Sequence, residues 1–210
     1  KTEKTNFNKV IAFHDLNRMC ERGTTRGIYN YAKYNESLLN NKSIILYNNA
    51  YKHDQNIIKK FSEKFQIYGY NSLSDMENII DKCKIDALLI LKQGENDGIL
   101  PKNTKAIVQC IFNCNEPHGD IYCALNESLP NYNNNQILPR IIDLPKPTQN
   151  IRQQLKIPED AIVFGRHGGM YQFDIQYAQE AVIEVAFNNP NIYFIFVNTK
   201  PFYDKTPNII

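Results

Sequence analysis

Short apolar runs rich in β-forming residues alternate along this chain with longer segments whose apolar residues recur at helical spacing. The first run, Lys9 to His14, is followed by a polar loop and by a helical pattern from Gly27 to Leu39. The expected strands that follow are 43–47, 66–70, 87–91, 105–112 and 121–125, and the expected helices are 53–65 and a segment from a cap at Ser74 to about residue 83. Because strands that alternate with helices form mostly parallel sheets covered on both faces, we predict an α/β fold with a Rossmann-like lobe.

A change in composition marks a boundary in the second half of the chain. Residues 129–150 are rich in asparagine and proline and lack a helical period, so we interpret them as an interdomain linker. The pattern then restarts with a helix at 151–155, a strand at 161–165, a helix at 175–187 and a strand at 191–198. Two parallel strands with so few helices cannot bury a core alone, so we expect an incomplete second Rossmann-like lobe. The expected domains are 1–145, and 146–210 with the linker and the start of a truncated second domain.

The overall composition argues against several classes of protein. The net charge of +2 leaves no basic excess for a nucleic-acid backbone, so no nucleic-acid partner is expected. No run approaches the roughly 18 apolar residues of a membrane span. The five cysteines are an odd number and form no disulfide framework, which favours a reducing compartment and a cytoplasmic location.

A glycine-containing turn is expected between the strand at 161–165 and the next helix. It reads Gly165-Arg166-His167-Gly168-Gly169, and free amides at such a junction attract an anion. The guanidinium of Arg166 suits a phosphate. We therefore take Arg166, Gly168 and Gly169 as candidate phosphate-binding residues. The alternative is that these glycines serve only the backbone conformation of the turn.

A second polar turn, Arg22 to Gly27, opens the first expected helix after the leading strand. Ligands of open α/β folds bind at this end of the sheet, so this turn, with its two hydroxyls, two arginines and free amides, is a candidate polar wall of a ligand site. The alternative is a solvated loop with a helix cap. The turn contains neither a dinucleotide-binding fingerprint nor a P-loop.

The loop at 113–120 gathers titratable groups after a strand. It contains His118 and Asp120, which we take as candidate catalytic residues, although a loop histidine is often only a surface residue. His14 and Asp174 are possible substrate contacts, and Asp174 could equally be part of a helix entry. The cysteines near His118 lack the spacing of a zinc site, so no metal is expected.

Three segments together resemble glycosyltransferases of the GT-B, group 1 or family 4-like type. They are Glu21–Tyr47 (ERGTTRGIYNYAKYNESLLNNKSIILY), Glu116–Leu129 (EPHGDIYCALNESL) and Leu155–Val182 (LKIPEDAIVFGRHGGMYQFDIQYAQEAV). The resemblance runs from about Lys9 to Thr199. It implies two Rossmann-like lobes, with the acceptor mainly on the first and the nucleotide-sugar donor mainly on the second.

The resemblance also implies roles for individual residues. Gly23 and Thr24 would approach the donor phosphates or the transferred sugar, His118 would lie near the reacting sugar, and Arg166 would neutralise the diphosphate leaving group. The implied reaction is a retaining sugar transfer that needs no metal or other cofactor, from a nucleotide sugar to a glycan, protein or small-molecule acceptor. The family's later acidic motif would lie beyond Ile210, so we expect this stretch alone to be inactive.

Two other functions remain compatible with these residues. One is a noncatalytic sugar- or nucleotide-binding module of the same fold, and the other is a GT-B-like sugar-nucleotide epimerase. An epimerase changes the sugar without an acceptor, so product analysis separates it from a transferase.

Overall fold

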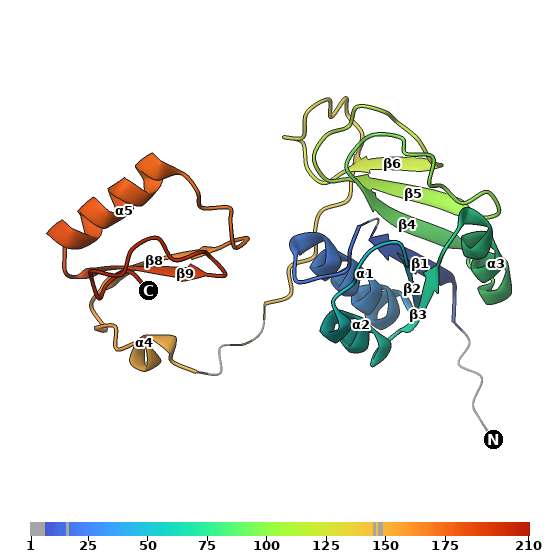
Figure 1. The fold of residues 1–210 in the computed structure, drawn as a ribbon. Helices are drawn as coiled ribbons and strands as arrows, with labels where there is room; N and C mark the ends of the chain where they lie inside the picture. Colours follow the sequence, from blue (N-terminus) through green and yellow to red (C-terminus); the bar gives the residue numbers. More distant parts are fainter. Residues whose placement is uncertain (1–6, 16, 145, 147–148) are drawn as a thin grey trace, which may run out of the picture. The chain divides into compact units, whose positions relative to one another are not determined.

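The computed structural model describes residues 7–15, 17–144, 146 and 149–210, and the chain divides into two compact units (Figure 1). Unit 1 spans Lys1–Leu144 and unit 2 spans Pro145–Ile210. Each unit has its own sheet, and the two are described separately below. Among the helices that the structure describes, none combines the length and the apolar character needed to cross a membrane.

Unit 1 is built on a seven-stranded sheet in which every neighbouring pair of strands is parallel. The strands are β1 (Val10–Asp15), β2 (Lys42–Asn48), β3 (Gln66–Tyr70), β4 (Ala87–Lys92), β5 (Lys105–Cys110), β6 (Ile121–Ala124) and β7 (Gln136–Ile137). Their order is β3-β2-β1-β4-β5-β6-β7, so the direction in which strands are added reverses between β1 and β4. This is the α/β, Rossmann-like lobe expected from the sequence.

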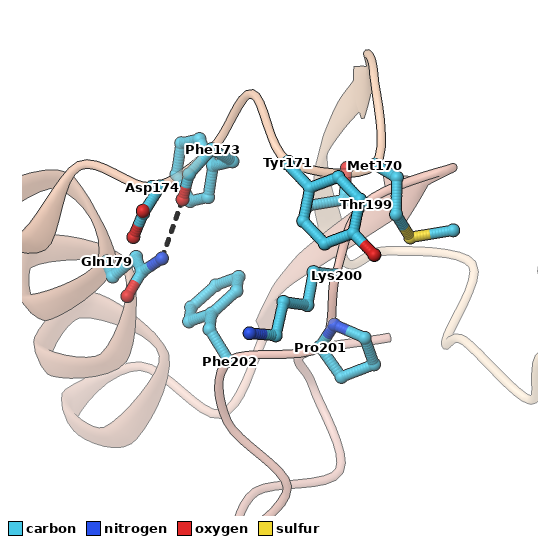
Figure 2. Close-up of a pocket in the computed structure, with 9 residues that line it drawn as sticks. All are labelled: Met170, Tyr171, Phe173, Asp174, Gln179, Thr199, Lys200, Pro201 and Phe202. Carbon is cyan, nitrogen blue, oxygen red and sulfur yellow. Dashed lines mark hydrogen bonds between the residues drawn. The ribbon is translucent and has the colours of Figure 1, made fainter.

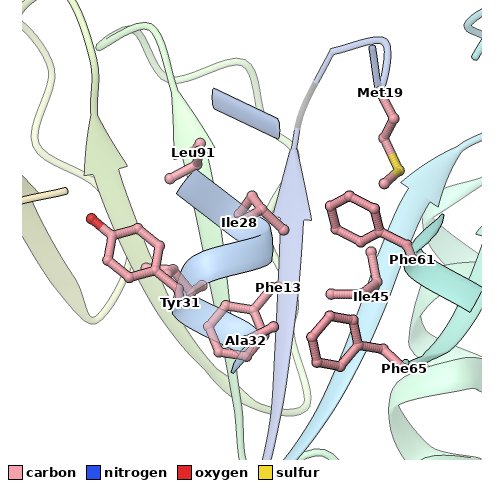
Figure 3. Close-up of a cluster of buried hydrophobic side chains, with 10 residues drawn as sticks. Phe13, Met19, Ile28, Tyr31, Ala32, Ile45, Phe61, Phe65 and Leu91 are labelled. Carbon is pink, nitrogen blue, oxygen red and sulfur yellow. The ribbon is translucent and has the colours of Figure 1, made fainter. Parts of the chain in front are cut away.

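Three helices cover the first part of this sheet: α1 (Gly23–Leu39), α2 (Gln55–Ser62) and α3 (Leu73–Cys83). Successive strand residues point to opposite faces, so each strand contributes to two cores. On one face Ile28 of α1 and Phe61 of α2 pack with Phe13 of β1 (Figure 3). On the other face, Met76 of α3 packs with Ile90 of β4.

The helix caps explain where α2 and α3 begin. Asp54 caps α2 by accepting hydrogen bonds from the amides of Asn56 and Ile57. Ser72 caps α3 by accepting from the amide of Asp75 at 3.1 Å. The expected cap at Ser74 is therefore wrong by two residues, and Ser74 lies inside the helix.

Part of the proline-rich segment expected to be a linker belongs to unit 1. After β7, residues 138–143 run along α1 in a segment that we call the strap. The hydroxyl of Tyr31 donates to the Pro139 carbonyl at 2.7 Å, and the side-chain amide of Asn30 donates to the Ile141 carbonyl at 2.8 Å. Pro139 bonds to α1 through its carbonyl oxygen, so its missing N–H costs no hydrogen bond to the helix. Strap, α1 and sheet together border an apolar groove of about 520 Å³.

Unit 2 is a strand-helix-strand unit preceded by a short helix. Its elements are α4 (Ile151–Gln154), β8 (Ile162–His167), α5 (Gln176–Asn188) and β9 (Ile192–Val197). The strands β8 and β9 are parallel and pair from Ile162 with Ile192 to His167 with Val197. The buried side-chain amide of Asn208 donates to the carbonyls of Ala186 and Ile192 at 2.8 and 2.7 Å, which ties the last residues to this unit.

The expected turn at Gly165–Gly169 begins later than its glycines suggested. Gly165, Arg166 and His167 lie within β8, because each pairs with a residue of β9. The connection to α5 starts at Gly168 and ends at Ile175, the residue before the helix.

Candidate functional site

Unit 2 contains a pocket of about 280 Å³ beyond the carboxyl ends of its two strands (Figure 2). It is lined by Met170, Tyr171, Phe173, Asp174, Gln179, Thr199, Lys200, Pro201 and Phe202. These residues come from the β8–α5 connection, from the first turns of α5 and from the segment after β9. The carboxyl ends of parallel strands are where open α/β sheets bind ligands.

Backbone and side-chain hydrogen bonds join the two segments that form the pocket. The amide of Lys200 donates to the Met170 carbonyl at 2.7 Å. The side-chain amide of Asn198 donates to the Gly168 carbonyl at 2.8 Å. Two of the lining rings, Phe173 and Phe202, pack on each other and on Phe196 of β9, with centroids 5.0 to 5.4 Å apart. The pocket is therefore supported by hydrogen bonds and by an aromatic cluster.

Arg166 contacts the wall of this pocket through two of its lining residues. Its Nη1 donates to the Thr199 hydroxyl at 2.9 Å, and its guanidinium carbon lies 5.0 Å from the centre of the Phe173 ring. The position depends on Gly168, since a Cβ atom there would lie 2.4 Å from Nη1 of Arg166. A guanidinium has five N–H groups, so the bond to Thr199 uses one of them.

Gly168 and Gly169 do not present free amides to the pocket. The amide of Gly168 donates to the Val197 carbonyl at 3.3 Å, and the amide of Gly169 donates to the Gln172 side chain at 3.0 Å. Positive charge at the pocket therefore comes from the side chains of Lys200 and Arg166. Asp174, a candidate from the sequence, is one of the lining residues and supplies a carboxylate.

At the carboxyl end of β1, unit 1 carries a buried carboxylate in front of α1. Asp15 is 2% exposed and accepts hydrogen bonds from the hydroxyls of Thr25 at 2.7 Å and Thr24 at 3.3 Å. It also forms an ion pair of 3.1 Å with Arg22. The carbonyl of Gly23 accepts a hydrogen bond from Arg140. The Thr24 hydroxyl, expected near a ligand phosphate, thus donates to the protein's own Asp15.

The opposite face of the same edge holds a second buried polar group. His14 is fully buried, and its Nε2 lies 2.9 Å from the Tyr70 hydroxyl. Burial, and next the charge of Lys92, lower the pKa of His14 to about 4, so this imidazole is neutral at pH 7. The ammonium of Lys92 forms an ion pair with Asp97. His14, Lys92 and Asp97 therefore lie together at the reversal point of the sheet.

His118 is largely buried. Its Nδ1 lies 2.6 Å from the Glu116 carbonyl and its ring centre 5.3 Å from that of Tyr122. Its Nε2 is buried and has no hydrogen-bond partner within the described part of the chain. The carbonyl can only accept, so Nδ1 carries a proton.

Asp120 lies just before β6, at the amino edge of the sheet, where its carboxylate joins two strands. It accepts from the Ala106 amide at 2.8 Å and pairs with Lys105 at 2.9 Å. These two contacts, the amide first, lower the pKa of the Asp120 carboxyl. In a parallel sheet the amino edge is opposite the carboxyl edge, so the structure does not bring Asp120 to the edge that carries Asp15.

Sequence reasoning missed four charged residues at the carboxyl edges of the two sheets. Asp15, Lys92 and Asp97 belong to unit 1, and Lys200 belongs to unit 2. For Asp15 and Lys92 a signal existed, since each is the charged last residue of an apolar strand and so lies at the carboxyl edge of the sheet, where ligands bind. Across the ranges described, no group of three or more His, Cys, Asp or Glu side chains is arranged to hold a metal ion.

Comparison with known proteins gives no relative: no family model, no curated protein and no solved structure matches this chain.

Proposed function

We propose that the protein is a glycosyltransferase that takes a sugar from a nucleotide-sugar donor, and that the unit 2 pocket binds the nucleoside diphosphate. The observation that carries this proposal is the pairing of two cations with aromatic rings at one pocket. Lys200 lines it, and Arg166 contacts its walls at Phe173 and Thr199. A nucleoside diphosphate has a ring to pack on the aromatic side chains and a charged group for the cations.

The charge chemistry of sugar transfer fits this arrangement. The bond from the sugar's anomeric carbon to the diphosphate breaks, a bond from that carbon to an acceptor oxygen forms, and the acceptor hydroxyl gives its proton to the departing diphosphate. Negative charge builds on the departing diphosphate, and fixed cations stabilise it. In this proposal Arg166 and Lys200 supply that charge, and Asp174 accepts a hydrogen bond from a hydroxyl of the donor.

The resemblance of Glu21–Tyr47, Glu116–Leu129 and Leu155–Val182 to GT-B glycosyltransferases supports the same reading. Retention of the anomeric configuration and the role of His118 near the reacting sugar come from this resemblance. For His118 to act, its buried Nε2 must become accessible to the donor.

Calorimetric titration with UDP, GDP and ADP tests the binding step. We expect one of them to bind, and Arg166→Ala and Lys200→Ala each to weaken that binding several-fold. Lys205→Ala is the matched control, because Lys205 is an exposed lysine of the same unit outside the pocket lining. Equal affinity in all four proteins would contradict the assignment of the pocket.

Product analysis with a labelled nucleotide sugar then tests the reaction. Transfer of label to an acceptor supports the transferase, a changed sugar without an acceptor identifies an epimerase, and binding without either product identifies a noncatalytic module.

A further inference from the structure

A fully buried lysine ends the strand β4 in unit 1. The side chain of Lys92 has no exposed surface, and its ammonium is paired with Asp97, whose side chain is 30% exposed. A buried ammonium is tolerated only with a charged partner, because desolvation of an unpaired charge is costly. Asp97 comes from the loop after β4, so a loop residue supplies the negative charge that this buried lysine requires.

His14 lies next to this ion pair and has an unused hydrogen-bonding atom. The β1–β4 register pairs His14 with Ile90, so Lys92 lies two residues further along β4 on the same face of the sheet. The two side chains are therefore diagonal neighbours on adjacent strands. The Nδ1 atom of His14 is buried and, among the described residues, has no hydrogen-bond partner. Buried polar atoms are nearly always paired, so this atom points to a group that is not part of the chain.

The location of the pair is also that of a ligand site. The order of the strands reverses between β1 and β4, and open α/β sheets bind ligands in the crevice at this reversal point. The buried cation, the unpaired ring nitrogen and the topology are three separate observations at one place.

We propose that Lys92 and His14 form a binding site for a small oxyanion, a carboxylate or a phosphate, and that the Asp97 carboxylate occupies this site in the free protein. A ligand oxyanion replaces Asp97 on the ammonium of Lys92. When the Tyr70 hydroxyl donates to Nε2 of His14, the ring proton is on Nδ1, and Nδ1–H donates to a second oxygen of the ligand.

The loop that carries Asp97 is built so that this carboxylate can leave. Gly98 follows it with a φ of 73°, and an added Cβ atom at Gly98 would meet nothing within 4 Å. The neighbouring part of the loop is fixed, because the carbonyl of Gly94 accepts from the Tyr122 hydroxyl at 2.8 Å. The amide of Asn96 is also held, by Glu116 at 2.8 Å, and the amide of Gly98 by the Asn96 side chain at 3.1 Å. A ligand therefore has to displace only the Asp97 side chain, whose other bond is to the Ile99 amide at 3.0 Å.

The test removes the internal carboxylate and measures the affinity for two probes. We expect Asp97→Ala to bind acetate or inorganic phosphate at least tenfold more tightly than the wild type, at ionic strength held constant with chloride. A tethered carboxylate competes at an effective concentration on the order of millimolar or more, and the substitution ends that competition. Tighter acetate binding identifies a carboxylate ligand, and tighter phosphate binding a phosphate ligand.

Two further variants separate this site from a structural ion pair. The double variant Asp97→Ala with Lys92→Met should lose the tighter binding of acetate or phosphate that Asp97→Ala alone shows. Asp86→Ala is the matched control, because Asp86 also accepts from one lysine and one backbone amide but lies at the exposed amino edge. No gain in Asp97→Ala, an equal gain in Asp86→Ala, or a gain that survives Lys92→Met would overturn the proposal.

If Asp97→Ala does not fold alone, the refolded fraction is measured against probe concentration. Rescue by acetate or phosphate but not by chloride supports the site, and failure of both probes contradicts it. The unit 2 pocket is unchanged in every variant, so the outcome is independent of the proposed transferase activity.

Discussion

The carboxyl edges of the two parallel sheets differ in how their cations are paired. In unit 1, Arg22 pairs with the buried Asp15 and Lys92 pairs with Asp97. In unit 2, Arg166 contacts a hydroxyl and an aromatic ring, and Lys200 lines an open pocket. Across the described residues, the ion pairs of the molecule all lie in unit 1.

The carboxyl edge of a parallel sheet can therefore hold its cations in two ways, either paired with the protein's own carboxylates or open to a ligand. An edge that carries its own carboxylates is stable without a ligand, and an oxyanion must compete with those carboxylates to bind. At the unit 2 edge the Asp174 carboxylate also lines the pocket, but among the described residues no ion pair joins it to Arg166 or Lys200. These two cations are therefore not held by an internal carboxylate. The predictions below test each half of this comparison.

The largest expected effect is a pH dependence that arises at the unit 1 edge. The pKa of His14 is lowered to about 4 in the folded protein, below the ordinary 6.5. The unfolded chain therefore binds more protons between these values, and the stability present above pH 6.5 is lost as the pH falls toward 4. The loss is about 3 kcal/mol. Denaturant titrations of wild type and His14→Gln from pH 7 to pH 4 should show it in the wild type alone.

The comparison with His14→Gln isolates this one group, because the two proteins share every other titratable side chain. If His14→Gln and the wild type had the same pH profile, the pKa of His14 would have to be the same in the folded protein and in the unfolded chain.

The second effect concerns the carboxylate in front of α1. Asp15→Ala leaves the Thr24 and Thr25 hydroxyls without their acceptor and Arg22 without its counter-charge. Because Arg22 remains about one-third exposed, we expect a loss of about 2 kcal/mol of unfolding free energy, less than the roughly 3–5 kcal/mol of a fully buried pair. Hydrogen exchange of the β1 and α1 amides would measure it, and Asp86→Ala should cost much less. Equal losses would mean that burial of Asp15 adds nothing.

The third effect is on ligand binding in unit 2. Gly168→Ala places a Cβ atom 2.4 Å from Nη1 of Arg166, so the guanidinium must move. We expect about a tenfold weaker affinity for the nucleoside diphosphate, which is about 1.4 kcal/mol. Gly165→Ala is the matched control, because its Cβ atom would meet nothing within 4 Å. Similar affinities for the two variants would show that Arg166 does not contribute to binding of the nucleoside diphosphate.

The smallest expected effect on stability is that of Asp120→Asn, which distinguishes a structural role of Asp120 from a catalytic one. Its carboxylate and its partner Lys105 are exposed, so Asp120→Asn should barely move the denaturation midpoint. If Asp120 is catalytic, the same variant should lower the transfer rate strongly at this unchanged stability. A wild-type rate would remove Asp120 from the candidate catalytic residues.

The class of the fold could be predicted because strand and helix patterns are local. The expected strand at 43–47 corresponds to β2, which adds one residue at each end. The extent of β8 could not be predicted in this way, because Gly165 favours a turn locally but is held in the strand by pairing with Ile195 of β9. Pairing with a distant strand outweighs the preference of a single residue.

The candidate site was predictable only in part for a similar reason. Asp174 and Arg166 stand near a recognisable strand-to-helix junction, and one lines the pocket while the other contacts its wall. Lys200 follows the last strand in an ordinary polar segment, and only the bond from its amide to Met170 reveals that it reaches the pocket. The use of the Thr24 hydroxyl by Asp15 likewise depends on tertiary contacts.

The strap has a consequence for the order in which the chain is synthesised. Asn30 of α1 finds its partner in Ile141, 111 residues later, and Tyr31 finds Pro139 108 residues later. On the ribosome, the side chains of Asn30 and Tyr31 emerge without these partners, and the strap follows roughly 5 to 20 seconds later at ordinary rates of about 5–20 residues per second. During this interval the apolar groove beside α1 lacks one wall, so nascent unit 1 exposes apolar side chains that the strap later borders. Unit 1, which begins with β1, can therefore complete its fold only after the strap has been synthesised.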